Sequence, residues 1–98
     1  MEKKLDKDCN AFVSHTLMGK MDSVKVYGEP SPRSRELLVA GLHTRIQRGD
    51  VIHYKAGNIY QDYRVKSREK VRQGSIWATK VSVDQMLSEI SEIMEGAD

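Results

Sequence analysis

The spacing of apolar residues changes along the chain, and its first part has the spacing of a helix. Here the apolar side chains recur at Leu5, Cys9, Phe12, Val13 and Leu17. Such a stripe predicts a helix over about residues 5–18, with Gly19 as its stop. Residues 24–27 then alternate between apolar and polar, which predicts a short edge strand.

A second helix is predicted to begin at Ser31-Pro32. A serine can accept hydrogen bonds from the free amides of a first helical turn, and a proline in that turn loses no intrahelical bond. The residues that follow place Leu38, Leu42 and Ile46 at helical spacing. We therefore expect this helix to run to about Arg48.

The middle of the chain predicts a β-hairpin. Residues 51–55 and 59–66 have the alternation of strands, and Gly57-Asn58 between them suits a tight turn. Side chains along a strand alternate between two faces, so the second arm should present one packed face and one charged face. The predicted packed face holds Ile59, Gln61, Tyr63 and Val65, and the charged face holds Tyr60, Asp62, Arg64 and Lys66.

The last part of the chain predicts a strand followed by a helix. Residues 75–81 alternate and form the predicted third strand. Ser82 and Gln85 then have the spacing of a capping box, and an apolar stripe follows as far as Gly96, which predicts an amphipathic helix. The residues of that stripe are Val83, Met86, Leu87, Ile90, Ile93 and Met94.

These elements together predict an α+β fold. It would consist of two N-terminal helices, a small antiparallel sheet of three to four strands and one C-terminal amphipathic helix. A chain of 98 residues suits a single domain spanning residues 1–98. The predicted core brings together Leu42, Val65, Trp77, Leu87 and Ile90.

Charge is distributed unevenly along the chain. Residues 1–80 carry 16 Lys or Arg against 9 Asp or Glu, whereas residues 81–98 carry 5 acidic residues and no basic one. This asymmetry favours an acidic or polyanionic macromolecule as the partner of the basic part. The densest basic run consists of Arg64, Lys66, Arg68, Lys70 and Arg72.

No motif in the sequence indicates catalysis, a cofactor or a metal. His15, His43 and His53 lack the spacing of metal ligands, and the seven glycines form no phosphate-binding loop. Cys9 is the sole cysteine, and a lone cysteine is more often a small buried residue than a nucleophile. We therefore expect a protein that is not an enzyme and that uses no cofactor and no metal.

The same sequence predicts a cytoplasmic protein that does not act on a membrane. No stretch approaches the roughly 20 apolar residues that cross a bilayer, and the first residues lack the apolar segment of a secretory signal. A single cysteine also cannot form an internal disulfide, which favours a reducing compartment.

Two functional hypotheses from different classes follow. The favoured one is a small protein-binding factor, such as an adaptor or an inhibitor of the type that phages and mobile elements encode, which occupies a partner's surface stoichiometrically through the basic hairpin. The alternative is a nucleic-acid-binding module that uses the same hairpin and the connection 67–74. The pI of about 8.7 lies below the usual pI of a nucleic-acid-binding domain, which favours a protein partner.

A homodimer through the C-terminal helix fits either hypothesis. The predicted contact residues are Tyr60, Arg64, Lys66, Arg68, Lys70 and Arg72, with Arg33 and Arg35 as secondary contacts.

Overall fold

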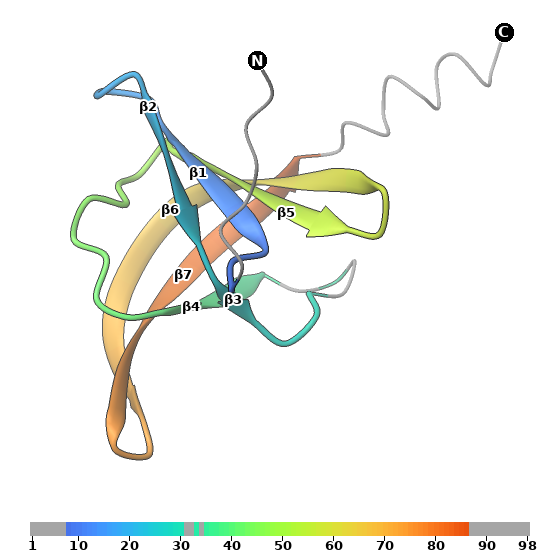
Figure 1. Cartoon of the computed structure of the whole chain (residues 1–98). Helices are drawn as coiled ribbons and strands as arrows, with labels where there is room; N and C mark the ends of the chain where they lie inside the picture. Colours follow the sequence, from blue (N-terminus) through green and yellow to red (C-terminus); the bar gives the residue numbers. More distant parts are fainter. Residues whose placement is uncertain (1–7, 31–32, 34, 87–98) are drawn as a thin grey trace, which may run out of the picture.

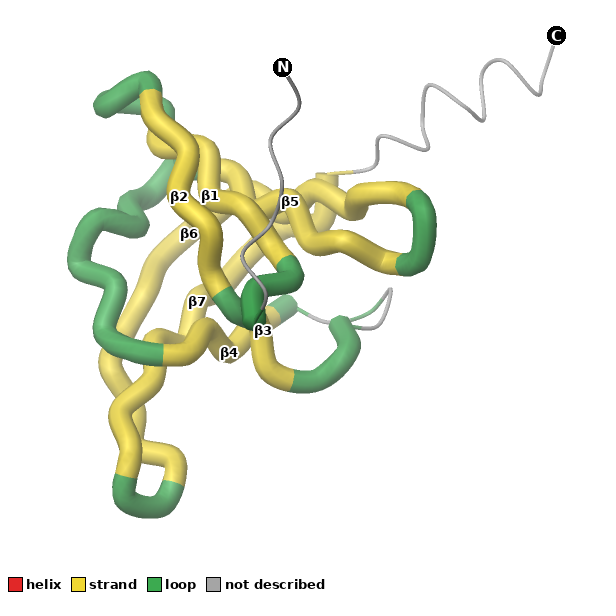
Figure 2. The backbone as a smooth tube through the Cα atoms, in the orientation of Figure 1, coloured by secondary structure: helices red, strands yellow, loops and turns green. Residues whose placement is uncertain are grey.

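The computed structural model describes residues 8–30, 33 and 35–86, and within these residues the chain forms strands and no helix (Figure 1). Neighbouring strands are antiparallel, in the order β2-β1-β5-β6-β7-β4-β3 (Figure 2). The strands are β1 (Ala11–His15), β2 (Lys20–Val24), β3 (Val26–Tyr27), β4 (Glu36–Ala40), β5 (Val51–Ala56), β6 (Ile59–Gln73) and β7 (Ile76–Met86).

The two ends of the sheet, β2 and β3, are separated in the chain by Lys25 alone. One continuous run of chain therefore pairs with β1 through its first half and with β4 through its second, and the sheet curls into a barrel-like wall. Asn10 fastens the seam, because its side-chain amide donates to the Val26 carbonyl oxygen at 2.9 Å and accepts from the Val26 amide at 2.7 Å. This side chain thus takes the place of a backbone peptide group in a strand ladder.

The core fills the inside of this wall with side chains from every second strand position. The alternation is clear on β4, where Leu37 and Val39 are buried, and on β6, where Tyr63 and Val65 are buried. The buried cluster consists of Ala11, Val13, Val24, Val26, Leu37, Val39, Ile46, Ile52, Tyr54, Tyr63, Val65, Val81 and Val83.

The predicted hairpin in the middle of the chain is confirmed. Strand β5 and the start of β6 pair as far as Ala56 opposite Ile59, and Gly57 adopts the positive φ of 68° that the turn needs. The predicted strand at residues 75–81 is also present as the first part of β7.

The predicted α+β class is wrong, because the described part of the chain is all-β. Residues 11–15 form β1 instead of part of a helix over 5–18, and residues 36–40 form β4 instead of part of a helix from Ser31 to Arg48. The sheet has seven strands instead of three or four. Strand pairing satisfies each segment's backbone groups through distant partners, and this overrides the local helical spacing.

The predicted C-terminal helix is wrong over its first turn. Residues 82–86 continue β7, which pairs with β6 on one side and with β4 on the other. The rest of that helix, including Leu87 and Ile90, lies outside the described residues. Of the other predicted core residues, Val65 is buried, whereas Leu42 is 49% exposed and Trp77 is 42% exposed.

Candidate functional site

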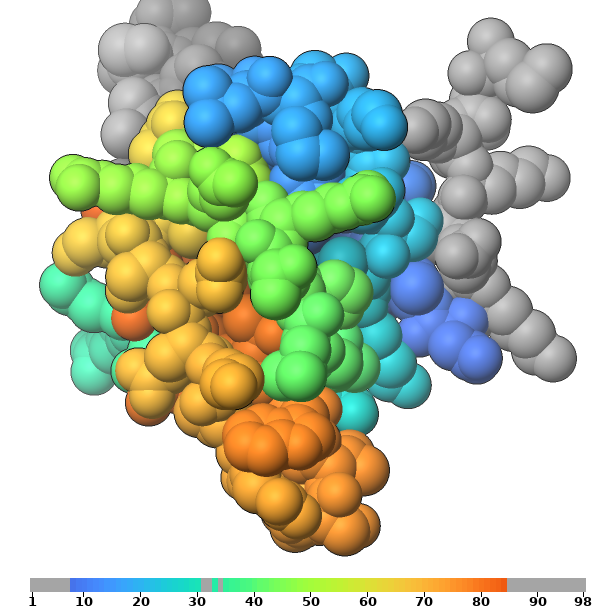
Figure 3. Space-filling model, turned by 90° about the vertical axis from the view of Figure 1, so that its left-hand side faces the viewer, coloured from blue at the N-terminus to red at the C-terminus, as the bar shows by residue number. Residues whose placement is uncertain are grey.

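The longest pair of strands, β6 and β7, carries the predicted basic run, and its far end projects from the body of the barrel (Figure 3). The pairing is regular except for a bulge between Val65 and Ser67. A bulge adds one residue to one strand and therefore exchanges the two faces of that strand beyond it. Without this extra residue, Ser67 and Glu69 would share the inward face of Val65. With it, Arg68 pairs with the buried Val81 and takes the inward face.

The bulge therefore divides the predicted contact residues between two faces of the sheet. Tyr63 and Val65 are buried and point into the core. Side chains alternate along a strand, so Tyr60 and Arg64 lie on the outer face. Arg68 and the two cations after it share the face of Val81, although they extend beyond the core. The predicted contact residues therefore do not form one continuous basic face.

Two of these cations hold a neighbouring segment in place. The Arg68 guanidinium donates to the carbonyl oxygens of Ile46 at 2.5 Å and Thr44 at 3.1 Å. The Arg64 guanidinium donates to the Gly49 carbonyl oxygen at 3.2 Å. Both contacts fix the segment 41–50, which we call the cover segment and which inserts Ile46 into the core. Their first role is to stabilise the fold.

The remaining predicted contacts lie at separate places. Lys66 pairs with Asp84 at 3.9 Å on the outer face. The Tyr60 ring lies 6.2 Å from the Phe12 ring, measured between centroids, at the opposite end of β6 from the tip. Arg35 is exposed beside Lys66, where both line a shallow pocket. Arg33 lies in the connection before β4.

The projecting end of the hairpin combines an exposed aromatic ring with cations. Trp77 stands directly opposite Arg72, whose guanidinium carbon lies 5.0 Å from the centre of the indole ring. The Lys70 ammonium lies 5.6 Å from the same centre. Ile76, on the opposite face of β7, is 50% exposed. We call Lys70, Arg72, Ile76 and Trp77 the hairpin tip, which exposes one large apolar side chain on each face and carries two cations against the ring of Trp77.

The tip departs from the sequence prediction in one respect that matters. The sequence places Trp77 in the core, because it alternates with Thr79 and Val81 and the structure keeps all three on one face. The barrel ends before Trp77, so the ring has no interior to enter. Only the strand lengths and the pairing register, which the sequence does not specify, could have identified it as a surface residue.

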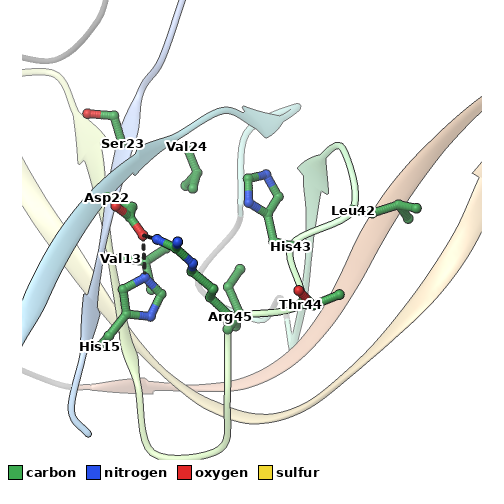
Figure 4. Close-up of a pocket in the computed structure, with 10 residues that line it drawn as sticks. Val13, His15, Asp22, Ser23, Val24, Leu42, His43, Thr44 and Arg45 are labelled. Atoms are coloured by element: carbon green, nitrogen blue, oxygen red, sulfur yellow. Dashed lines mark hydrogen bonds and ion pairs between the residues drawn. The ribbon is translucent and has the colours of Figure 1, made fainter. Parts of the chain in front are cut away.

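A second feature is a cavity of about 470 Å³ between β2 and the cover segment (Figure 4). Its apolar side includes Val13 and Ile46, and its polar rim includes Asp22 and Arg45, whose charged groups approach to 3.8 Å. In Figure 4 the Arg45 guanidinium reaches across to the Asp22 carboxylate, which also contacts His15. The ion pair therefore spans the rim of the cavity.

His15 at the side of this cavity is held by carboxylates on both sides of its ring. Its Nε2 lies 2.7 Å from Asp22 Oδ2, and its Nδ1 lies 3.0 Å from Asp50 Oδ2. Both ring nitrogens can donate at once only when the imidazole carries two protons. Asp50 is itself 2% exposed and accepts from the amides of Thr16 and Gln47. His15 and Asp50 thus join β1 to the cover segment, and both ring nitrogens contact carboxylates.

A second histidine, His53 on the outer face, contacts one carboxylate and one serine hydroxyl instead of two carboxylates. His53 Nδ1 lies 2.8 Å from Asp62 Oδ1, and its Nε2 lies 2.7 Å from Ser14 Oγ. These three residues come from adjacent strands β1, β5 and β6. They are 39 and 9 positions apart in the chain, so no local spacing in the sequence could have indicated the cluster.

Within the described ranges, no helix is long and apolar enough to cross a membrane, and no three metal-binding side chains are placed to hold an ion. The comparisons with known proteins give no relative: no protein-family model, no curated protein and no solved structure matches this chain.

Proposed function

We propose that this chain is a small protein-binding factor that inserts the hairpin tip into an acidic-rimmed pocket of a partner protein. The observation that carries the proposal is Trp77, which is 42% exposed at the end of a projecting hairpin with two cations against its ring. Tryptophan and arginine are the residues most enriched among the few that dominate the energy of protein interfaces. The transfer of an indole ring from water into a protein pocket also contributes favourable free energy, because apolar surface is buried.

The distribution of the cations supports a protein partner over a nucleic acid. Binding to a phosphate backbone depends on several Lys and Arg side chains that each neutralise a phosphate. Arg64 and Arg68 instead donate to carbonyl oxygens of the cover segment, and Lys66 pairs with Asp84. The tip itself adds Lys70 and Arg72, which suit the charged rim around an apolar anchor better than a track for a polyanion.

Nucleic-acid binding is the second candidate, and the ring and the two cations at the tip favour it. Single-stranded nucleic acids bind proteins through bases that stack on aromatic rings and phosphates that pair with nearby cations. Trp77 with Lys70 and Arg72 offers both kinds of contact on a small scale. For either candidate we propose the cytoplasm as the compartment, in keeping with the single cysteine of the sequence.

Shortening the hairpin tests the proposal without disturbing the barrel. Residues 72–77 are replaced by Asn-Gly, which leaves Val71 opposite Ala78 as the last pair and gives a two-residue turn of a favoured type. When the tagged parent protein is purified from the cells that produce it and treated with nuclease, one partner protein should co-purify with it in near-equal amount. The shortened variant should retain less than about a tenth of it, as expected when a central interface residue that contributes 2 kcal/mol or more is lost.

The matched control is Tyr27→Ala, because Tyr27 is an exposed aromatic on β3 with 37% exposure, close to that of Trp77. This variant should retain the protein as the parent does. Equal retention by the parent and the shortened variant, with unchanged thermal midpoints, would contradict the proposal. Trp77 is the only tryptophan of the sequence, so its emission tests the second candidate directly: quenching by single-stranded oligonucleotides at physiological salt would favour nucleic acid as the partner.

A further inference from the structure

Ser14, His53 and Asp62 form a chain of hydrogen bonds like the one that activates a serine nucleophile. Asp62 Oδ1 contacts His53 Nδ1 at 2.8 Å, and Ser14 Oγ contacts His53 Nε2 at 2.7 Å. A neutral imidazole that donates from Nδ1 to the carboxylate leaves Nε2 as an acceptor for the serine hydroxyl proton. One tautomer therefore satisfies both contacts, unlike His15, whose two nitrogens both face carboxylates.

Strand pairing holds the three side chains on one exposed face. His53 stands directly opposite Asp62 in the pairing of β5 with β6. Ser14 stands opposite Val51, two positions from His53 on the same face of β5. The His53 side chain is 25% exposed and that of Asp62 is 29% exposed, so the cluster lies at the surface. The relay is thus rigid and accessible.

A cation lies on the same side of the barrel as the serine. In the strand register Ser14 pairs with Val51, and Val51 pairs with Arg64. The Arg64 guanidinium and the Thr16 hydroxyl both donate to the Gly49 carbonyl oxygen, at 3.2 and 2.9 Å, which brings the guanidinium next to the end of β1. A positive group there would attract the negative oxygen that develops when a hydroxyl attacks a carbonyl.

An apolar side chain borders the serine on its other side. Met21 of β2 stands directly opposite Ser14 and is 39% exposed. The register thus places an apolar contact on one side of the hydroxyl and a cation on the other. This combination suits an ester whose acyl part is apolar and whose carbonyl oxygen becomes negative during the reaction.

We propose that Ser14 is a nucleophile for esters of small apolar carboxylic acids, an activity separate from binding at the hairpin tip. Ser14 Oγ bonds to the carbonyl carbon while His53 Nε2 takes the hydroxyl proton and passes it to the departing alcohol oxygen, whose bond to the carbonyl breaks. Water then attacks the acyl group on Ser14 and gives its proton to His53, which returns it to Oγ as the acid leaves. Asp62 is a positioning residue that holds the imidazole in the reactive tautomer.

The test uses the full chain with two probes: a fluorophosphonate, which bonds to activated serines and releases fluoride, and p-nitrophenyl butyrate, whose hydrolysis is followed by colour. Mass spectrometry of peptides should place the phosphonyl group on Ser14. His53→Gln should lower the labelling rate at least about a hundredfold, the contribution of a general base. Ser14→Ala should abolish labelling and return butyrate hydrolysis to the buffer rate.

Ser23→Ala is the matched control, since Ser23 lies on the same outer face of β2, opposite Phe12. It should label like the parent. Thermal midpoints of all variants, compared with the parent's, separate lost chemistry from lost folding, and Ser14→Cys provides a variant of nearly unchanged size whose thiol should react with iodoacetamide faster than Cys9. An unlabelled Ser14 in the folded parent, or equal labelling of the parent and His53→Gln, would overturn the proposal.

Discussion

The two halves of the β6–β7 pair differ sharply in burial, although both belong to one antiparallel ladder. In the half that forms barrel wall, Tyr63 and Val65 are at most 1% exposed, and Val83 opposite Val65 is equally buried. In the projecting half, Trp77 is 42% exposed and Ile76 is 50% exposed. The bulge after Val65 lies between them. The face of β7 that supplies Val81 and Val83 to the core therefore carries the exposed Trp77 at its other end, where we propose that it binds a partner.

This difference shows that a side chain's face does not determine its burial. A strand face is buried only where another part of the chain lies over it. The cover segment contacts Arg68 of β6 through Ile46 and Thr44, and it contacts Thr79 of β7, whose hydroxyl donates to the Gly41 carbonyl oxygen at 2.7 Å and accepts from the His43 amide at 2.9 Å. Thr79 is 2% exposed, whereas Trp77, two positions further on the same face, is 42% exposed. Substitutions in the wall should therefore change stability, and substitutions in the tip should change binding.

The largest effect on stability is expected from Tyr63→Ala. Removal of a fully buried aromatic side chain typically costs about 3 to 5 kcal/mol, since the cavity that remains is filled only in part. In a domain of this size that loss should unfold a large fraction of the protein at 37 °C. Urea denaturation followed by Trp77 emission measures it, and a midpoint equal to that of the parent would contradict the placement of Tyr63 in the core.

Arg68→Ala should have an intermediate effect. The substitution removes the charged donor from the Ile46 and Thr44 carbonyl oxygens, which should cost roughly 1 to 3 kcal/mol and loosen the cover segment. Arg72→Ala is the matched arginine on the other half and should cost less than about 1 kcal/mol. Hydrogen exchange should rise at residues 41–50 in Arg68→Ala alone; equal effects of the two substitutions would remove the distinction between the halves.

The smallest effect on stability is expected from Trp77→Ala. A half-exposed ring in contact with Lys70 and Arg72 gains about 0.5 to 1 kcal/mol from these cation–π contacts. Circular dichroism should therefore report a thermal midpoint within a few degrees of the parent's, by the usual scaling for a domain of this length. A loss as large as that of Tyr63→Ala would mean that Trp77 belongs to the core.

Some strands could be predicted from the sequence because a single local pattern specified them. The β5–β6 hairpin has alternating arms and Gly57 at its turn, and no helical spacing competes there. In β1 the inward residues are Ala11, Val13 and His15. His15 is buried because Asp22 and Asp50 contact both of its ring nitrogens. In the sequence it counts as a polar residue, so the alternation of buried and exposed positions in β1 is not recognisable there. In β4 a run of apolar residues fits a helix and a strand equally well, and pairing with β7 decides between them.

The candidate site was predicted in part for a related reason. Charge density singled out the run from Arg64 to Arg72, which includes two members of the hairpin tip, Lys70 and Arg72. The predicted connection 67–74 is wrong, because residues 67–73 belong to β6 and pair with β7. The sequence does not reveal the bulge that puts Arg64 and Arg68 on opposite faces. It also does not reveal that Arg64 donates to the Gly49 carbonyl oxygen and Arg68 to that of Ile46. Those contacts join residues more than ten positions apart and arise only when the barrel closes.

The most direct test of the division between wall and tip is site-specific photo-crosslinking in the cells that produce the protein. A benzophenone amino acid is introduced in place of Trp77, and in a second variant in place of Tyr27, which is similarly exposed on another part of the barrel. Our account predicts that light converts the first variant into one discrete, heavier protein–protein adduct that survives nuclease treatment, and leaves the second variant unchanged. Adducts of equal yield from both positions, or none from position 77 in the folded protein, would contradict it.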